Sequence, residues 1–107
     1  MGEHPRMSKQ TLQLLAAMLE DPQADWFGLQ LSRITRILPG TLYPILHRLE
    51  RAGWLDARTE AIDPVQERRP ARRLYRLTGK GELAARARLE HAPAVMRRTL
   101  KLRGQHG

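Results

Sequence analysis

The sequence predicts a mainly α-helical fold with a small β-hairpin, and three observations lead to it. Two helical patterns stand on either side of a four-residue break, the hydrophobic period changes from helical to alternating after Gly53, and a helical composition returns after Thr78. A chain of 107 residues can bury one modest core. We therefore expect one folded domain over residues 1–78, followed by a C-terminal helix and a short tail over residues 79–107.

The charge of the chain indicates a polyanionic partner. Lys and Arg number 19 against 11 Asp and Glu, which gives a formal net charge of +8, and the isoelectric point is about 11.2. The absence of cysteine excludes disulfides, thiolate zinc sites and cysteine nucleophiles. The apolar run LQLLAAML is too short to cross a bilayer and the start MGEHPRMSKQ lacks a signal-peptide layout, so we expect a cytoplasmic protein without membrane contact.

The first two predicted helices are short. In SKQTLQLLAAMLEDP the apolar residues recur at helical spacing, with Ser8 as the N-cap and Pro22 just beyond the end, which predicts about three turns. After a polar break, WFGLQLSRI predicts a second, shorter helix that Gly28 weakens. The segment TRIL then makes a tight connection to the next helix.

A third helix is predicted from Pro39 or Thr41 to Ala52, with Gly53 in the place of a left-handed C-cap. One face is apolar and would enter the core. It carries Leu42, Ile45, Leu46 and Leu49. The opposite face is polar, basic and aromatic. It carries Thr41, Tyr43, Pro44, His47, Arg48 and Arg51.

The position of Pro44 bears on where this helix begins. With Thr41 as the cap, Pro44 lies in the first turn, where its missing N–H costs no helical bond; with a start at Pro39 it costs a bond to Gly40. We prefer the start at Thr41. In both cases, two helices joined by a four-residue turn match the helix-turn-helix layout, whose second helix inserts its N-terminal turns into the major groove of DNA.

An arginine-rich hairpin is predicted after this unit. WLDARTE and RRLYRLT alternate as strands do, and AIDPVQERRPA between them is too long for a tight turn, so we expect it to form the hairpin tip. Glu60, Asp63 and Glu67 offset the positive charge only in part, and the hairpin gains nothing from its arginines without a counter-anion. We interpret it as a wing that follows the phosphate backbone or reaches into the minor groove. Its arginines are Arg58, Arg68, Arg69, Arg72, Arg73 and Arg76.

The last segment is helical by composition, with Thr78 as its expected N-cap and Pro93 at a place where it can kink or split. A terminal helix with no later element to pack on must lie on its own domain or on a second copy, and this one is too long for its own domain alone. We therefore expect a homodimer. The expected dimer contacts are Leu83, Ala87, Val95, Met96 and Leu100.

These motifs carry a family resemblance. LPGTLYPILHRLERAGWL and RRPARRLYRLTGKG, in this order of elements, resemble the PadR family of winged-helix transcriptional regulators in its short form with a single C-terminal helix. The resemblance implies a winged helix-turn-helix with a dimerisation helix, acting as a homodimeric repressor on a palindromic operator. It implies release by an effector, a small molecule or a metal ion, and no required cofactor. The DNA-binding residues would be Thr41, Tyr43, Pro44, His47, Arg48, Arg51, Arg68, Arg69, Arg72 and Arg73.

The chain departs from the family pattern at several positions. Arg36 replaces a glycine usual in the helix-turn-helix turn, so a non-glycine residue has to hold that backbone. Arg68 stands where the family usually has glycine before Arg-Pro, which adds a cation and stiffens the tip. Trp26 and Trp54 both precede the wing, so a drug site between tryptophans of paired C-terminal helices is not supported. We expect Trp54 to fill the core and Trp26 to pack the second helix onto the domain, with an inter-subunit pocket as the alternative for Trp26.

Other functions fit the sequence less well. The four histidines are scattered, no Ser/His/Asp order occurs and no glycine-rich phosphate loop is present, so we predict that the chain is not an enzyme. Glu90 and His91 are weak candidates for a metal sensor at a dimer interface, because adjacent residues on a helix point in different directions. The competing class is a structural or interaction module. It is either an architectural DNA-binding protein without operator choice, whose binding would be indifferent to sequence, or a winged helix that binds protein.

Overall fold

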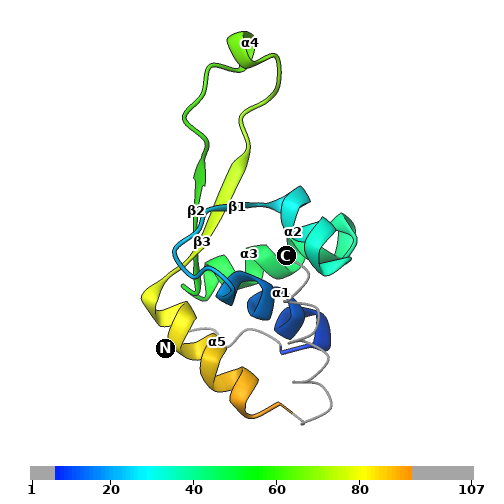
Figure 1. The fold of residues 1–107 in the computed structure, drawn as a ribbon, viewed down its shortest axis with the longest axis vertical. Coiled ribbons are helices and arrows are strands. Elements are labelled where there is room, and N and C mark those ends of the chain that lie inside the picture. Colours follow the sequence, from blue (N-terminus) through cyan, green and yellow to red (C-terminus); the bar gives the residue numbers. More distant parts are fainter. Residues whose placement is uncertain (1–6, 93–107) are drawn as a thin grey trace.

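The computed structural model describes residues 7–92 of the chain (Figure 1). Four helices, α1, α2, α3 and α5, form the body, and the hairpin of β2 and β3 projects from it with the single-turn helix α4 at its tip. This is the predicted fold class, mainly helical with a small antiparallel sheet. The elements are α1 (Lys9–Leu19), β1 (Trp26–Phe27), α2 (Gly28–Thr35), α3 (Pro39–Arg51), β2 (Leu55–Thr59), α4 (Pro64–Glu67), β3 (Arg73–Leu77) and α5 (Gly79–Glu90).

The first helix forms as its sequence predicts. The side chain of Ser8 caps α1 by accepting the N–H of Thr11 at 3.1 Å. The helix ends at Leu19, before Pro22. Its inner face is buried almost completely, and it shares one core with α2, α3, the sheet and α5. The largest fully buried apolar side chains are Leu14, Leu15, Met18, Leu31, Leu42, Leu46, Leu49 and Leu55.

The sheet has three strands, in the order β1-β3-β2, whereas the sequence predicted a two-stranded hairpin. Trp26 and Phe27 were expected inside the second helix, but they pair antiparallel with Tyr75 and Leu74 of β3. The helix therefore begins only at Gly28. Two aromatic residues fit a pleated sheet well, and their partner strand lies far along the chain, so the local helical pattern hid this pairing.

Helix α3 begins at Pro39 and not with Thr41 as its cap, so the preferred start was wrong. Leu38 is the N-cap, and its carbonyl accepts the N–H groups of both Thr41 and Leu42 at 2.9 Å. Proline suits this first helical position, since its fixed φ is already helical and its N–H would be unpaired there. Pro44 consequently lies inside the helix, where its missing N–H removes the bond to Gly40.

The end of α3 follows the prediction. Gly53 has φ +79°, the left-handed conformation expected of it, and the N–H of Trp54 bonds to the carbonyl of Leu49 at 2.9 Å. Trp54 is 4% exposed, which confirms that it fills the core. Trp26 is half-buried and packs against the same core from β1.

The wing consists of two paired strands and a short helix at its tip. β2 and β3 pair in register from Leu55 with Leu77 to Thr59 with Arg73. The hairpin tip contains the helix α4, whose N-cap Asp63 accepts the N–H of Val65 at 3.0 Å. An Asp-Pro pair is a strong helix start, because the aspartate caps and the proline takes the first helical position.

Helix α5 starts as predicted and is fastened to the end of α3. Thr78 caps it by accepting the N–H of Gly81 at 2.9 Å. A Cβ on Gly81 would lie 2.8 Å from Trp54 Cα and closer still to its carbonyl oxygen, so only glycine fits this crossing. The helix ends at Glu90. Pro93 and the predicted dimer contacts Val95, Met96 and Leu100 lie outside the described residues.

Candidate nucleic-acid interface

Helix α3 is divided cleanly between core and solvent. The four residues of its apolar face are all buried, at 2% exposure or less. Its other side faces solvent, and Tyr43, the largest side chain there, is 41% exposed. The structure thus brings all six predicted α3 residues onto one open surface, as the helical spacing predicts. They are Thr41, Tyr43, Pro44, His47, Arg48 and Arg51.

The turn between α2 and α3 is held by side-chain hydroxyls around a left-handed arginine. Arg36 adopts φ 61° and ψ 23°, the conformation that a glycine would take without strain. Thr35 Oγ1 donates to the carbonyl of Leu31 at 2.7 Å and accepts the N–H of Ile37 at 3.2 Å. Ser32 Oγ donates to the carbonyl of Ile37 at 2.6 Å. These bonds fix the direction in which α3 leaves the turn.

Tyr43 is also placed by α2. Its ring lies over the backbone of Gly28, where an added Cβ would come within 2.6 Å of the ring carbon Cε1. Gly28 therefore has a packing role, which sequence analysis missed when it treated this glycine only as a weakness in the helix. The backbone of α2 at Gly28 supports one side of the Tyr43 ring, and the other side is open to solvent.

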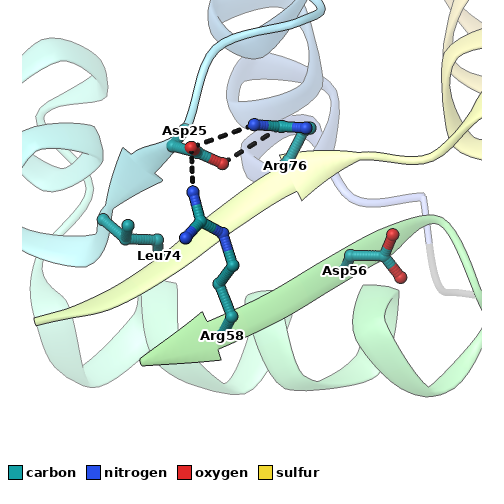
Figure 2. Close-up of a pocket in the computed structure, with 5 residues that line it drawn as sticks. All are labelled: Asp25, Asp56, Arg58, Leu74 and Arg76. Carbon is teal, nitrogen blue, oxygen red and sulfur yellow. Dashed lines mark hydrogen bonds and ion pairs between the residues drawn. The ribbon is translucent and has the colours of Figure 1, made fainter. Parts of the chain in front are cut away.

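A buttress of one aspartate and two arginines holds the base of the wing (Figure 2). Asp25, just before β1, accepts hydrogen bonds from Arg76 at 3.1 and 3.0 Å and a further, short one from Arg58. Hydrogen bonding by Arg76 and by Arg58 holds the pKa of the Asp25 carboxyl below its ordinary value. Asp25 lies 51 positions from Arg76 in sequence, so no local pattern could indicate this cluster.

Two more wing arginines have carboxylate partners. Arg69 Nη1 and Nη2 bond to the two carboxylate oxygens of Glu60 at 2.7 and 3.2 Å, which keeps the pKa of Glu60 below its ordinary value. The backbone N–H of Arg72 also donates to Glu60 at 3.2 Å. Arg73 donates to Glu50 of α3 at 3.1 Å and ties the wing to that helix. The acids of the hairpin thus offset its arginines only in part, and Asp25 and Glu50 supply further negative charge from outside the hairpin.

Arg72 and Arg68 differ from these paired arginines. The guanidinium carbon of Arg72 lies 4.2 Å from the centre of the Phe27 ring, a cation–π contact that leaves its edge N–H groups available. Arg68 has φ 56° at the end of α4, and its side chain is exposed. Neither side chain forms an ion pair with an acidic residue in the part of the chain that the structure describes.

A small hollow of about 110 Å³ lies on the outer face of the sheet, beside the Asp25 cluster. Arg58 and Arg76 both point toward Asp25, while Asp56 stands apart on β2 (Figure 2). Asp25, Arg58 and Arg76 already satisfy one another by hydrogen bonds. It supports the wing and does not have the character of an open ligand pocket.

The remaining predicted site residues lie on α5. Leu83 is 74% exposed and Ala87 is exposed one turn later, so both are free of the domain core. Glu90 and His91 were the weak metal candidates; His91 Nδ1 lies 2.7 Å from the carbonyl of Ala87. Within residues 7–92, no three His, Asp or Glu side chains gather as a metal site, and no helix is long and apolar enough to span a membrane.

Comparison with known proteins decides the family. The profile of the transcriptional regulator PadR-like family matches residues 28–87, more than half of the chain. This chain belongs to that family. The match spans the helix-turn-helix, the wing and most of α5, so the PadR-like region contains every described residue predicted to bind DNA.

Related proteins agree with this assignment. The PadR-like chain is 45% identical over 60 residues to Transcriptional regulator Rv3488 of Mycobacterium tuberculosis, a match covering 55% of this chain. It spans about half the length of that curated relative, 51%. The names of the family and of this relative denote transcriptional regulators, which confirms the prediction that the chain is not an enzyme.

Two solved structures share the fold. The PadR-like transcription factor of Bacteroides fragilis superposes with a TM-score of 0.58 at 28% identity, over 77% of this chain and 80% of the other. The PcaV transcriptional regulator of Streptomyces coelicolor, solved in complex with its natural ligand, gives 0.63 at 25% identity, over 92% of this chain and 63% of the other.

Proposed function

We propose that this PadR-like regulator binds double-stranded DNA sequence-specifically as a homodimer and represses transcription from a palindromic operator. The observation that carries the proposal is the open surface of α3. A helix following a helix-turn-helix turn, with its apolar side buried and a polar, basic and aromatic side exposed, has the shape and chemistry of a major-groove reader.

Within α3 the roles divide along the helix. Thr41, Tyr43 and Pro44 lie in its N-terminal half, the part that approaches base edges in a helix-turn-helix complex. His47, Arg48 and Arg51 follow toward the C-terminal half, where we assign them contacts to phosphates and to the groove edge. The ring of Tyr43, supported by Gly28, gives the surface a rigid aromatic contact.

The wing supplies the flanking contacts. Arg68 at the tip and Arg72 on the stem present guanidinium groups that no carboxylate of the described chain engages, so we assign phosphate binding chiefly to them. Arg69 and Arg73 are held by Glu60 and Glu50, and we give them the support of the wing as their first role, with DNA contact as a secondary one. Ion pairs at a surface are weak in water, so a phosphate can compete for these arginines.

Dimerisation would set the spacing of two such units. The exposed Leu83 and Ala87 provide an apolar stripe on α5 for a second copy, together with the predicted contacts beyond the described residues. Two α3 helices separated by one helical turn of DNA, about 34 Å, would enter successive major grooves on one face. A repressor bound in this way would exclude the transcription machinery from the site.

Release by an effector completes the proposal. PcaV, a fold neighbour, was solved with its natural ligand, which supports a ligand-responsive regulator without naming an effector for this chain. An effector acts only if it binds better to a dimer in which the spacing of the two α3 helices is wrong for DNA.

The test begins with selection of bound duplexes from a random-sequence pool. Fluorescence anisotropy then compares the selected duplex with a scrambled one at two salt concentrations. We expect a preference of about 10³-fold or more for the selected duplex. Equal affinities that fall together with salt would overturn sequence-specific binding and indicate a general DNA-coating protein.

Sedimentation equilibrium tests the dimer separately. At micromolar concentration we expect the mass of two 12.3 kDa chains. The mass of a single chain would overturn the homodimer and the two-site operator with it.

A further inference from the structure

Neither helix capping nor burial in the core explains why a leucine stands at position 38. It is the N-cap of α3, with φ −62° and ψ 146°, and its side chain makes no capping hydrogen bond. Leucine is among the least suitable N-cap residues, because the position favours side-chain oxygens that accept the free N–H groups of the first turn. The side chain is also 75% exposed. The chain therefore gives up capping stability at this position and gains no core packing from it.

The surrounding backbone holds this side chain out rigidly. On one side, Ile37 is 4% exposed and is fixed by hydrogen bonds to Ser32 and Thr35. On the other side, the ring of Pro39 restricts the backbone at the first position of α3. A Cβ built on Gly40 meets nothing within 4 Å, so this end of the helix is open. Leu38 is thus a preorganised apolar group beside Thr41, at the end of α3 assigned to the base edges.

We propose that Leu38 is a specificity-determining residue that packs against the 5-methyl group of a thymine in each operator half-site. The inference rests on the proposed function, since it requires α3 to lie in the major groove. Among the base edges of that groove, the thymine methyl is the apolar feature, while the others are hydrogen-bond donors and acceptors. An exposed leucine without a polar atom can read only this feature.

Replacement of thymine by deoxyuridine tests the contact, because it removes the methyl group and leaves base pairing intact. Each thymine of the selected duplex is replaced in turn, and affinities are measured by anisotropy. For the wild type we expect a loss of about four-fold at one thymine position per half-site, the value of one buried methyl group. For Leu38→Ala we expect weaker binding to the thymine duplex and no further loss at that position.

Leu29→Ala is the matched control. Leu29 is a second exposed leucine of the same helix-turn-helix, 50% exposed on α2. This variant should keep the full wild-type loss on deoxyuridine replacement. If Leu38→Ala remains as sensitive to deoxyuridine as the wild type, or if no position responds in the wild type, the thymine contact is wrong.

A second variant separates recognition from folding. Leu38→Ser restores a good N-cap, so we expect its thermal midpoint to rise by a few degrees while the thymine preference disappears. A Leu38→Ser protein with lowered midpoint, or a Leu38 variant with changed sedimentation mass, would show instead that Leu38 packs within the chain or between copies.

These outcomes are distinguishable from failure of the proposed function. If the wild type shows no preference for the selected duplex over the scrambled one, the proposed function itself fails. If the preference is present and the methyl response is absent, only the role of Leu38 fails.

Discussion

The ring of Tyr43 on α3 occupies the space that a side chain at Gly28 of α2 would fill. A methyl group on Gly28 would lie 2.6 Å from Tyr43 Cε1 and closer to the hydroxyl end of the ring, which can swing toward solvent because the side chain is 41% exposed. The absence of a side chain at Gly28 therefore sets the position of the aromatic group on the DNA-facing side of α3.

Gly28→Ala is expected to displace Tyr43 without unfolding the domain. The unfolding free energy should change by no more than about 1 kcal/mol, since the ring can move outward. Operator affinity should fall on the order of ten-fold, about as far as in Tyr43→Ala. The double variant should bind no more weakly than Tyr43→Ala alone. Gly79→Ala, at an open helix position, serves as control and should bind normally. Additive losses in the double variant would contradict this coupling.

Tyr43 and Arg72 should respond differently to salt. Tyr43→Ala is expected to lower affinity for the operator more than for scrambled DNA, because the ring lies among the base-reading residues of α3. Arg72→Ala should weaken both duplexes about equally and reduce the slope of log affinity against log salt by about one, as loss of one phosphate contact does. Anisotropy titrations at several salt concentrations measure both. Matching profiles for the two variants would count against the assigned roles.

Pro44→Ala should stabilise the fold while it weakens operator binding. The new N–H can bond to the carbonyl of Gly40 inside α3, and proline within a helix is costly. Part of this gain is offset by a more flexible unfolded chain, so we expect a net increase of about 1 to 2 kcal/mol in the unfolding free energy. Urea denaturation measures the change. A lower stability would mean that the Pro44 ring itself supports the domain.

Acid should weaken the buttress at Asp25. The folded carboxyl has a lowered pKa, because Arg76 and Arg58 bond to its charged form. As the pH falls, Asp25 therefore takes up a proton in the unfolded chain before it does so in the folded chain. The stabilisation of the fold by the Asp25 carboxylate is complete above the ordinary pKa of 3.8 and is lost as pH falls through the lowered value.

The corresponding measurement is the urea midpoint of wild type and Asp25→Asn between about pH 7 and pH 2. The wild type should be more stable at neutral pH, and the difference should shrink below about pH 4. Asp56→Asn is the matched control, because Asp56 lines the same hollow without accepting a hydrogen bond from either arginine. A difference for Asp25→Asn that stays constant into acid would rule out this linkage.

Local patterns predicted much of the fold and the reading surface. The spacing of Leu42, Ile45, Leu46 and Leu49 already separates the two faces of α3, and Ser8 and Thr78 cap their helices as their side-chain chemistry dictates. The replacement of a usual glycine by Arg36 also indicated that a non-glycine residue holds the backbone of the turn between α2 and α3. Each of these properties depends on residues within one or two helical turns.

What the sequence did not reveal depends on distant partners. Trp26 becomes a strand only because β3 lies beside it, and Asp25 finds Arg76 across 51 positions. Glu50 reaches Arg73 from another element, so the wing is better neutralised than its own composition suggests. The start of α3 was misplaced for a different reason. The cost of an internal Pro44 was given more weight than the preference of Pro39 for the first helical position.

Chemical-shift mapping by NMR tests the central claim most directly. Backbone amide spectra of the ¹⁵N-labelled chain are compared with and without the selected operator. We predict the largest shifts in the first half of α3 and around Arg68 and Arg72 of the wing, with small shifts in α1. Shifts concentrated on the outer sheet face around Asp25 and Asp56, with α3 unaffected, would contradict the assignment of α3 as the DNA-reading helix.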